Sequence, residues 1–117
     1  MKQASALAKK ITRVLSAKKA EDIKVLDVRK LSSVTDFFVF ATATSTVHVR
    51  ALAGELREKM KSDWTLHHLE GLEGGDWVLM DFIEVIVHLF LPQTREFYNL
   101  EQLWGDAKRL DVLPKRT

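Results

Sequence analysis

The chain has 117 residues, of which 46% are hydrophobic and 29% are charged, and its net charge is +2 at pH 7. This length is typical of one domain, and this balance is typical of a protein with a core rather than of a disordered chain. The sequence contains no cysteine, which excludes disulfides, thiolate nucleophiles and cysteine-ligated zinc. Lysines interrupt the apolar runs near the N-terminus, and no stretch supplies the ~20 apolar residues of a membrane span, so we expect a cytoplasmic protein without membrane contact.

The first half of the chain predicts two strands between two helices. Residues 3–19 have apolar side chains at helical spacing with lysines on the opposite side, which indicates an amphipathic helix. Residues 23–28 and 37–42 are rich in β-formers, and the second run is apolar throughout, as expected of a central strand. Residues 45–62 again have helical spacing, and Ser45 or Thr44 is placed to cap this helix by accepting a backbone N–H bond.

The second half predicts three more strands and a short helix. Residues 64–70 read as a strand that follows the helix 45–62, which implies a right-handed crossover and a strand parallel to 37–42. Residues 76–81 and 84–91 are separated by too few residues for anything but a hairpin. Residues 94–104 fit a short helix or helical turns. We therefore predict one α/β domain over 1–104, with a mixed sheet of about five strands flanked by helices, and a flexible C-terminal tail over 105–117.

The hairpin has two unlike faces. If Phe82 and Ile83 form a two-residue turn, the predicted pairs are Asp81 with Glu84, Leu79 with Ile86, and Trp77 with His88. Alternation of side chains then puts a plain core on one face, formed by Val78, Met80, Val85, Val87 and Leu89. The other face, here called the docking face, is formed by Trp77, Leu79, Asp81, Glu84, Ile86 and His88. This face suits either a surface partly covered by a helix or the C-terminal segment, or a protein-binding patch with a charged rim.

The sequence offers little for catalysis or for a metal ion. His67 and His68 are adjacent on a predicted strand, so they point to opposite faces and cannot chelate together. The other histidines, His48 and His88, match no metal motif. Ser45 lies at a strand-to-helix turn, but its neighbours lack the glycines of a nucleophile elbow or a phosphate loop. We therefore predict no catalytic residue, no metal site and no cofactor.

Three stretches together resemble one known family. They are "SSVTDFFVFATATSTVHVRALA" (residues 32–53), "EGLEGGDWVLMDFIEVIVHLF" (residues 70–90) and "REFYNLEQLW" (residues 95–104). In this order and at this spacing they resemble the ribosomal silencing factor family, RsfS, also called Iojap. The resemblance covers nearly the whole chain, from the first helix to Trp104, and it implies a fold similar to that of nucleotidyltransferases.

The resemblance also implies a function. Members of the family bind the large ribosomal subunit through large-subunit ribosomal protein fourteen, block its association with the small subunit sterically, and repress translation when nutrients are short. By this resemblance the docking face is the partner-binding site, flanked by Tyr98, Leu100 and Trp104. The family is not known for transferase activity, so the protein is not expected to be an enzyme.

Two departures from the family pattern add further expectations. Relatives commonly have glycine in the hairpin turn, where this chain has Phe82 and Ile83, so these side chains either are buried by a neighbouring molecule or extend the patch. The basic residues of the tail, Lys108, Arg109, Lys115 and Arg116, suggest a peripheral contact with ribosomal RNA. An apolar docking face without its partner also suggests a homodimer of the free protein.

Two alternative functions stay open on the sequence. A nucleotidyltransferase-like enzyme would use Asp27, Asp36 or Asp81 to hold magnesium and a nucleoside triphosphate, although no phosphate loop lies beside them. An RNA-binding module would need more positive charge than +2, or a strand in which aromatic and basic residues alternate.

Overall fold

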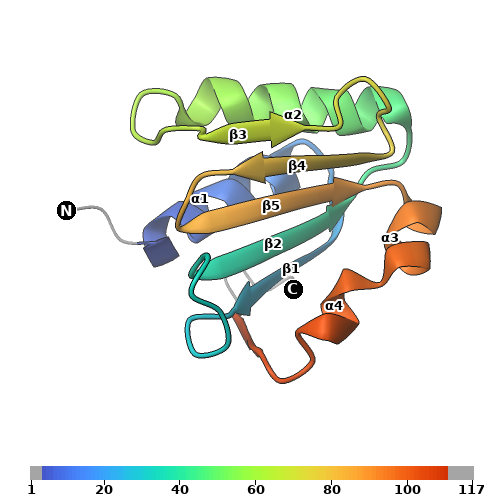
Figure 1. Cartoon of the computed structure of the whole chain (residues 1–117). Helices are drawn as coiled ribbons and strands as arrows, with labels where there is room; N and C mark the ends of the chain where they lie inside the picture. Colours follow the sequence, from blue (N-terminus) through green and yellow to red (C-terminus); the bar gives the residue numbers. More distant parts are fainter. Residues whose placement is uncertain (1–3, 111–117) are drawn as a thin grey trace, which may run out of the picture.

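A six-stranded mixed sheet organises the protein, which forms a single α/β domain in the computed structural model; the structure describes residues 4–110 (Figure 1). The strands lie in the order β3-β4-β5-β2-β1-β6. The strands are β1 (Glu21–Asp27), β2 (Phe37–Thr42), β3 (His68–Glu70), β4 (Trp77–Asp81), β5 (Val85–Phe90) and β6 (Lys108–Leu110). The helices of the described chain are α1 (Ala4–Ala17), α2 (Thr46–Met60), α3 (Pro92–Tyr98) and α4 (Leu100–Leu103).

The two middle strands, β2 and β5, are parallel, and every residue in them is buried. Continuous apolar runs are typical of strands covered on both faces, so the predicted central position of β2 is confirmed. The other pairings are antiparallel. Consequently β3 runs in the same direction as β2, as predicted, but β4 and β5 lie between them.

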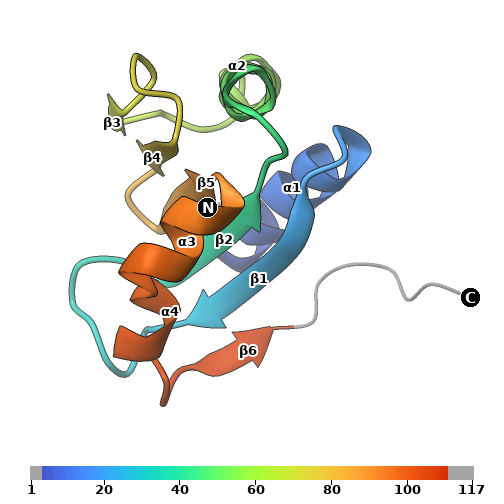
Figure 2. The same ribbon diagram turned by 90° about the vertical axis from the view of Figure 1, so that its right-hand side faces the viewer.

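Helices cover the two faces of the sheet unequally. The turned view shows α1 and α2 on one face, and α3 and α4 on the other (Figure 2). Leu7, Ile11, Leu52 and Leu56 are fully buried against the sheet, and they form the main core together with the inward side chains of β2, β4 and β5. Within residues 4–110, no helix is both long and apolar enough to cross a bilayer.

The predicted helix signals are confirmed. Ser45 caps α2, because its Oγ accepts a hydrogen bond from the backbone N–H of His48 at 3.1 Å. The predicted range 3–19 becomes Ala4–Ala17, after which Lys19 takes a left-handed conformation with φ of 66°. These differences of one or two residues are ordinary at helix ends.

Three predicted boundaries are wrong. The predicted strand 64–70 contracts to β3, and Trp64 and Leu66 before it pack against the main core instead. The short helix or helical turns predicted over 94–104 are α3 and α4, which begin earlier, at Pro92, and are separated by Asn99, whose left-handed φ of 45° ends α3. The predicted tail from residue 105 contains β6, which pairs with β1; residues 111–117 lie outside the described residues.

The hairpin register also differs from the prediction. The turn is Ile83–Glu84, with Phe82 opposite Val85, because the Phe82 side chain is buried in the main core and its N–H donates to the Val85 carbonyl at 2.9 Å. The predicted pairs are therefore wrong: Asp81 lies opposite Ile86, Leu79 opposite His88, and Trp77 opposite Phe90. Each partner moves by two residues, so the side chains of β4 and β5 keep their predicted faces, whereas Glu84 lies in the turn.

Candidate functional site

The sheet face opposite α1 and α2 carries a second apolar cluster, here called the aromatic face. Its buried members are Leu26, Val28, Phe38, Phe40, Ile86 and Phe90. Trp77, Leu79, Leu100, Trp104 and Ala107 pack against them and are partly exposed. This cluster exists because β1, β2, β4 and β5 all have apolar residues at the alternate positions that point away from α1 and α2.

His88 lies at the centre of the aromatic face and is 5% exposed. Its ring stacks on Phe40 at 5.1 Å and on Phe90 at 5.9 Å between centroids. The indole N–H of Trp77 donates to His88 Nδ1 at 3.1 Å, so the proton of the neutral imidazole is on Nε2. Burial lowers the pKa of His88 to about 4, so the ring is neutral near pH 7 and holds Trp77 in place.

Arg95 fixes α3 and α4 to the edge of this face. Its buried guanidinium donates to the Asp22 carbonyl at 2.7 Å, to Thr42 Oγ1 at 2.8 Å and to Glu101 Oε1 at 2.7 Å. Glu101 also accepts from Lys24 at 3.0 Å, and the pKa of its carboxyl is lowered by the hydrogen bonds from Arg95 and Lys24 against the opposing effect of burial. The result is a charged network that links α3 and α4 to β1 and β2.

The helices α3 and α4 leave part of the aromatic face open. In Figure 1 they lie at the lower right of the sheet, and no helix of the described chain lies in front of β3 and β4. Trp77, Leu79 and Asp81 on β4 are half-buried there. Tyr98 contacts Trp77 with 4.8 Å between ring centroids and is itself 50% exposed. An apolar surface with aromatic side chains therefore continues from β4 onto α3.

The structure places the nine predicted docking residues at different depths. Tyr98 is exposed, so it is available to a partner. Six others are half-buried: Trp77, Leu79, Asp81, Glu84, Leu100 and Trp104. By contrast, Ile86 and His88 are buried. Trp104 packs on Phe38 with 5.0 Å between ring centroids.

Two exposed apolar side chains near this surface were missed by the sequence reasoning. Phe97 is 80% exposed and meets Tyr98 edge-on at 5.0 Å, and Leu103 is 74% exposed. The sequence could have predicted their exposure, because a helix with apolar residues on more than one side leaves some of them exposed. The role of Arg95 could not be predicted from the sequence pattern, because its partners Asp22 and Thr42 are distant in sequence.

The two unusual residues at the hairpin tip, Phe82 and Ile83, differ in exposure. Phe82 is buried within this chain, so both predictions for it are wrong: it is not buried by a neighbouring molecule, and it does not extend the patch. Ile83 is half exposed, with φ of 75°, and the Glu84 N–H to Phe82 carbonyl bond closes a strained γ-turn around it. The Ile83 N–H donates to Asp81 Oδ1 at 2.7 Å, which holds that carboxylate at the rim of the docking face.

Two of the three acids of the enzyme alternative, Asp27 and Asp81, lie on opposite faces of the sheet. Asp27 pairs with Phe37 of β2 on the side of α1 and α2, whereas Asp81 is on the aromatic face. Asp27 is also bound by Arg29, whose guanidinium donates at 2.9 and 2.6 Å and lowers the pKa of the carboxyl. Among residues 4–110, no group of three His, Asp or Glu side chains is placed to hold a metal ion.

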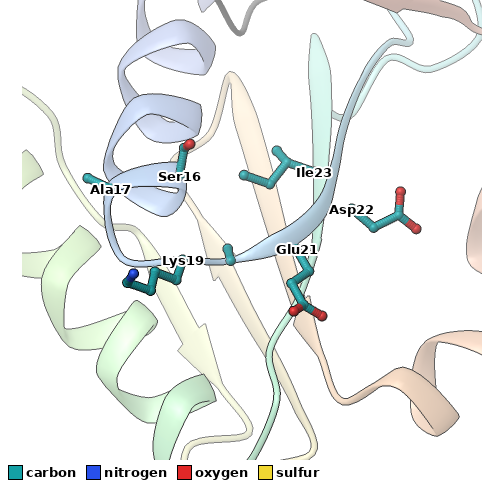
Figure 3. A pocket seen from close by; sticks show the side chains of 7 residues that line it. Ser16, Ala17, Lys19, Glu21, Asp22 and Ile23 are labelled. Atoms are coloured by element: carbon teal, nitrogen blue, oxygen red, sulfur yellow. The ribbon is translucent and has the colours of Figure 1, made fainter. Parts of the chain in front are cut away.

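A surface hollow of about 620 Å³ lies where α1 turns into β1 (Figure 3). Seven residues line it: Ser16, Ala17, Lys19, Ala20, Glu21, Asp22 and Ile23. The charged side chains Lys19, Glu21 and Asp22 point in different directions (Figure 3), so they form no convergent set of polar groups for a small ligand.

Fold and site together define a class: a small α/β protein whose sheet is covered by two helices on one face and offers a partly open aromatic surface on the other. The family model "Ribosomal silencing factor during starvation" matches residues 1–117. The chain belongs to this family, RsfS, as its sequence pattern suggested.

Individual relatives agree with this assignment. The chain is 38% identical to the ribosomal silencing factor RsfS of Bacillus subtilis over 96 residues, 81% of each chain. It is also 38% identical over 96 residues to the mouse protein named mitochondrial assembly of ribosomal large subunit protein 1, of which it covers 42%. A solved structure from Chromobacterium violaceum is similar at a TM-score of 0.87 and 34% identity, over 97% of this chain and 95% of that one.

Proposed function

We propose that this protein binds the large ribosomal subunit through large-subunit ribosomal protein fourteen, prevents the small subunit from joining, and so represses translation when nutrients are limited. Membership of the ribosomal silencing factor family supports the general role. The name of the mouse relative supports an association with the large subunit. Silencing of this kind is steric and needs no catalytic residue, and we place it in the cytoplasm.

The observation that carries the proposal is the open part of the aromatic face. Trp77 and Tyr98 present adjoining rings, Leu79 lies beside them, and Phe97 and Leu103 extend the apolar surface along α3 and α4. Large aromatic side chains are enriched at the centres of protein interfaces, where a few of them supply most of the binding energy. A folded protein gains little by leaving such a group of side chains in water.

The surrounding residues have distinct proposed roles. Asp81 and Glu84 form an acidic rim, which suits a partner surface with basic side chains around an apolar centre. Ile86 and His88 support the open surface from below, and His88 also orients Trp77 through its hydrogen bond. Leu100 and Trp104 hold α3 and α4 against the sheet, so they support Tyr98 indirectly.

Two further contacts belong to the proposal. Lys108 and Arg109 on β6, followed by Lys115 and Arg116 outside the described residues, would touch ribosomal RNA at the margin of the interface. The free protein would form a homodimer through the same apolar surface, and light scattering over a concentration series tests this.

Co-sedimentation with isolated ribosomal subunits tests the binding step. The protein is expected to pellet with large subunits and not with small ones. Trp77→Ala is expected to weaken binding by about 2 kcal/mol or more, roughly thirtyfold. Tyr98→Ala changes a more exposed residue and so separates a binding defect from a folding defect. Val47→Ala is the control, because Val47 is an exposed apolar side chain on α2, across the sheet.

Circular dichroism melts must accompany these variants. Normal melts with unchanged binding of both Trp77→Ala and Tyr98→Ala would show that the partner binds elsewhere. Loss of binding in Val47→Ala alone would move the docking site to the other face of the sheet.

A further inference from the structure

Charge is unevenly distributed between the layer formed by α1 and α2 and the rest of the described chain. Segments 4–19 and 46–63, which contain α1 and α2, hold nine lysines or arginines and three acids. The remaining described segments, 20–45 and 64–110, hold six lysines or arginines and twelve acids. The modest charge of the whole chain therefore conceals a helix layer with six excess positive charges and a remainder with six excess negative ones.

This division in sequence is also a division in space. Figure 2 shows α1 and α2 together on one face of the sheet, opposite α3 and α4. The two helices are antiparallel neighbours, because the His48 ring near the start of α2 bonds the Lys18 carbonyl after the end of α1, and Lys10 reaches Asp63 after the end of α2. Their outward sides therefore form one continuous surface.

The cations of this layer are largely unpaired. Among the described residues, its ion pairs are Lys10 with Asp63 at 3.1 Å and Lys61 with Glu58 at 3.0 Å. Lys9 and Arg13 lie one turn apart on α1, which has no acid, and both are exposed. Lys59 is exposed on the final turn of α2, close in sequence to Asp63 and so to the α1 contact. The layer has three acids against nine cations, so its net positive charge suits a polyanion.

We propose that the outward surface of α1 and α2 binds the phosphate backbone of duplex RNA. The family model describes a ribosomal silencing factor, and the ribosome is rich in structured RNA. Segments 4–19 and 46–63 contain no Phe, Trp or Tyr, so this surface offers few rings for stacking on unpaired bases and is better suited to backbone phosphates. It lies across the sheet from the proposed docking surface, so this inference goes beyond the proposed function, and the two surfaces can be occupied together.

Fluorescence anisotropy with a labelled RNA hairpin of about 20 base pairs tests the proposal. The triple variant Lys9→Gln, Arg13→Gln, Lys59→Gln is expected to bind at least tenfold more weakly in moderate salt. Its slope of log K against log salt should fall by about two to three, close to one for each phosphate that the protein no longer neutralises. The wild-type protein should prefer the hairpin over a single strand of the same composition.

The double variant Arg29→Gln, Lys30→Gln is the control, because both residues are exposed and lie outside the helix layer and the proposed RNA contacts. It is compared with Lys9→Gln, Arg13→Gln, which removes the same charge, and it is expected to bind RNA within about twofold of wild type. The proposal is overturned if this control loses binding while the helix-layer variant keeps it. Loss of binding in Lys108→Gln, Arg109→Gln with normal binding of the helix-layer variant would favour the β6 contact and would also overturn it. Absence of hairpin binding at low salt, a preference for the single strand, or binding to phosphatidylserine vesicles without binding to RNA would also overturn it.

The same assay keeps this inference separate from the docking proposal. Tyr98→Ala lies on the opposite side of the sheet and should bind the hairpin normally. If Tyr98→Ala abolishes RNA binding while the helix-layer variant keeps it, the RNA lies on the aromatic face and the proposal is refuted.

Discussion

Acid should destabilise this protein mainly through His88. Burial lowers the pKa of His88 from its ordinary value of 6.5 to about 4, so between these pH values the unfolded chain binds a proton that the folded chain excludes. Stability is therefore fully present above about pH 6.5 and declines as the pH falls. One pKa unit corresponds to about 1.4 kcal/mol, which gives a loss of about 2 kcal/mol at pH 5 and about 3 kcal/mol at pH 4.

Urea unfolding at about pH 8 and pH 5, for the wild type and for His88→Phe, measures this effect. Phe fits between Phe40 and Phe90 and does not ionise, so the variant should lose about 2 kcal/mol less than the wild type between the two pH values. Glu101 and Asp27 also lose stabilising ionisation on acidification, but only below their ordinary pKa values near 4. The reasoning is refuted if both proteins lose the same stability, or if the His88 imidazole resonance titrates near pH 6.5.

Two structural predictions concern the supports of the docking surface. Gly71→Ala should cost about 2 kcal/mol or more in urea unfolding, because Gly71 has φ of 94° and an added Cβ would lie 2.0 Å from the Trp77 carbonyl oxygen. Gly54→Ala, with nothing within 4 Å of the new Cβ in an exposed helix, should instead gain about 0.5–1 kcal/mol, and equal effects of the two changes would contradict this account. Arg95→Met should lower the free energy of unfolding by about 3 kcal/mol, because Glu101 then keeps only Lys24 as a cationic partner. It should also speed hydrogen exchange in α3 and α4. Unchanged exchange there would show that the network does not hold these helices.

The faces of the hairpin were predictable from the sequence, but its pairing was not. Alternation assigns Trp77 and Leu79 to the same side of the sheet. A change of turn leaves this side unchanged when the pairing of the two strands shifts by an even number of residues. The choice of turn depends on the burial of Phe82 against α2 and its neighbours, a tertiary contact that no local pattern contains. Nor does any local pattern indicate β6, because three residues with two cations lack the alternation of a strand.

The candidate site shows the same limit. Period-two spacing placed Ile86 and His88 on the correct side, but burial beneath neighbouring rings is decided by strand order. The attachment of α3 and α4 through Arg95 joins segments more than 50 residues apart, so it could not be read from sequence. The net charge of +2 is likewise a sum over the basic helix layer and the acidic remainder of the chain, so it does not indicate the basic layer.

A subunit-joining assay tests the central claim most directly. Light scattering would follow the association of purified small and large ribosomal subunits with increasing amounts of wild-type protein, Tyr98→Ala and Val47→Ala. The account predicts that the wild type and Val47→Ala reduce joining in proportion to large subunits bound, and that Tyr98→Ala requires a much higher concentration. Undiminished joining at saturating wild-type protein would contradict it, because a bound protein that leaves the subunit interface free cannot silence the ribosome by steric block.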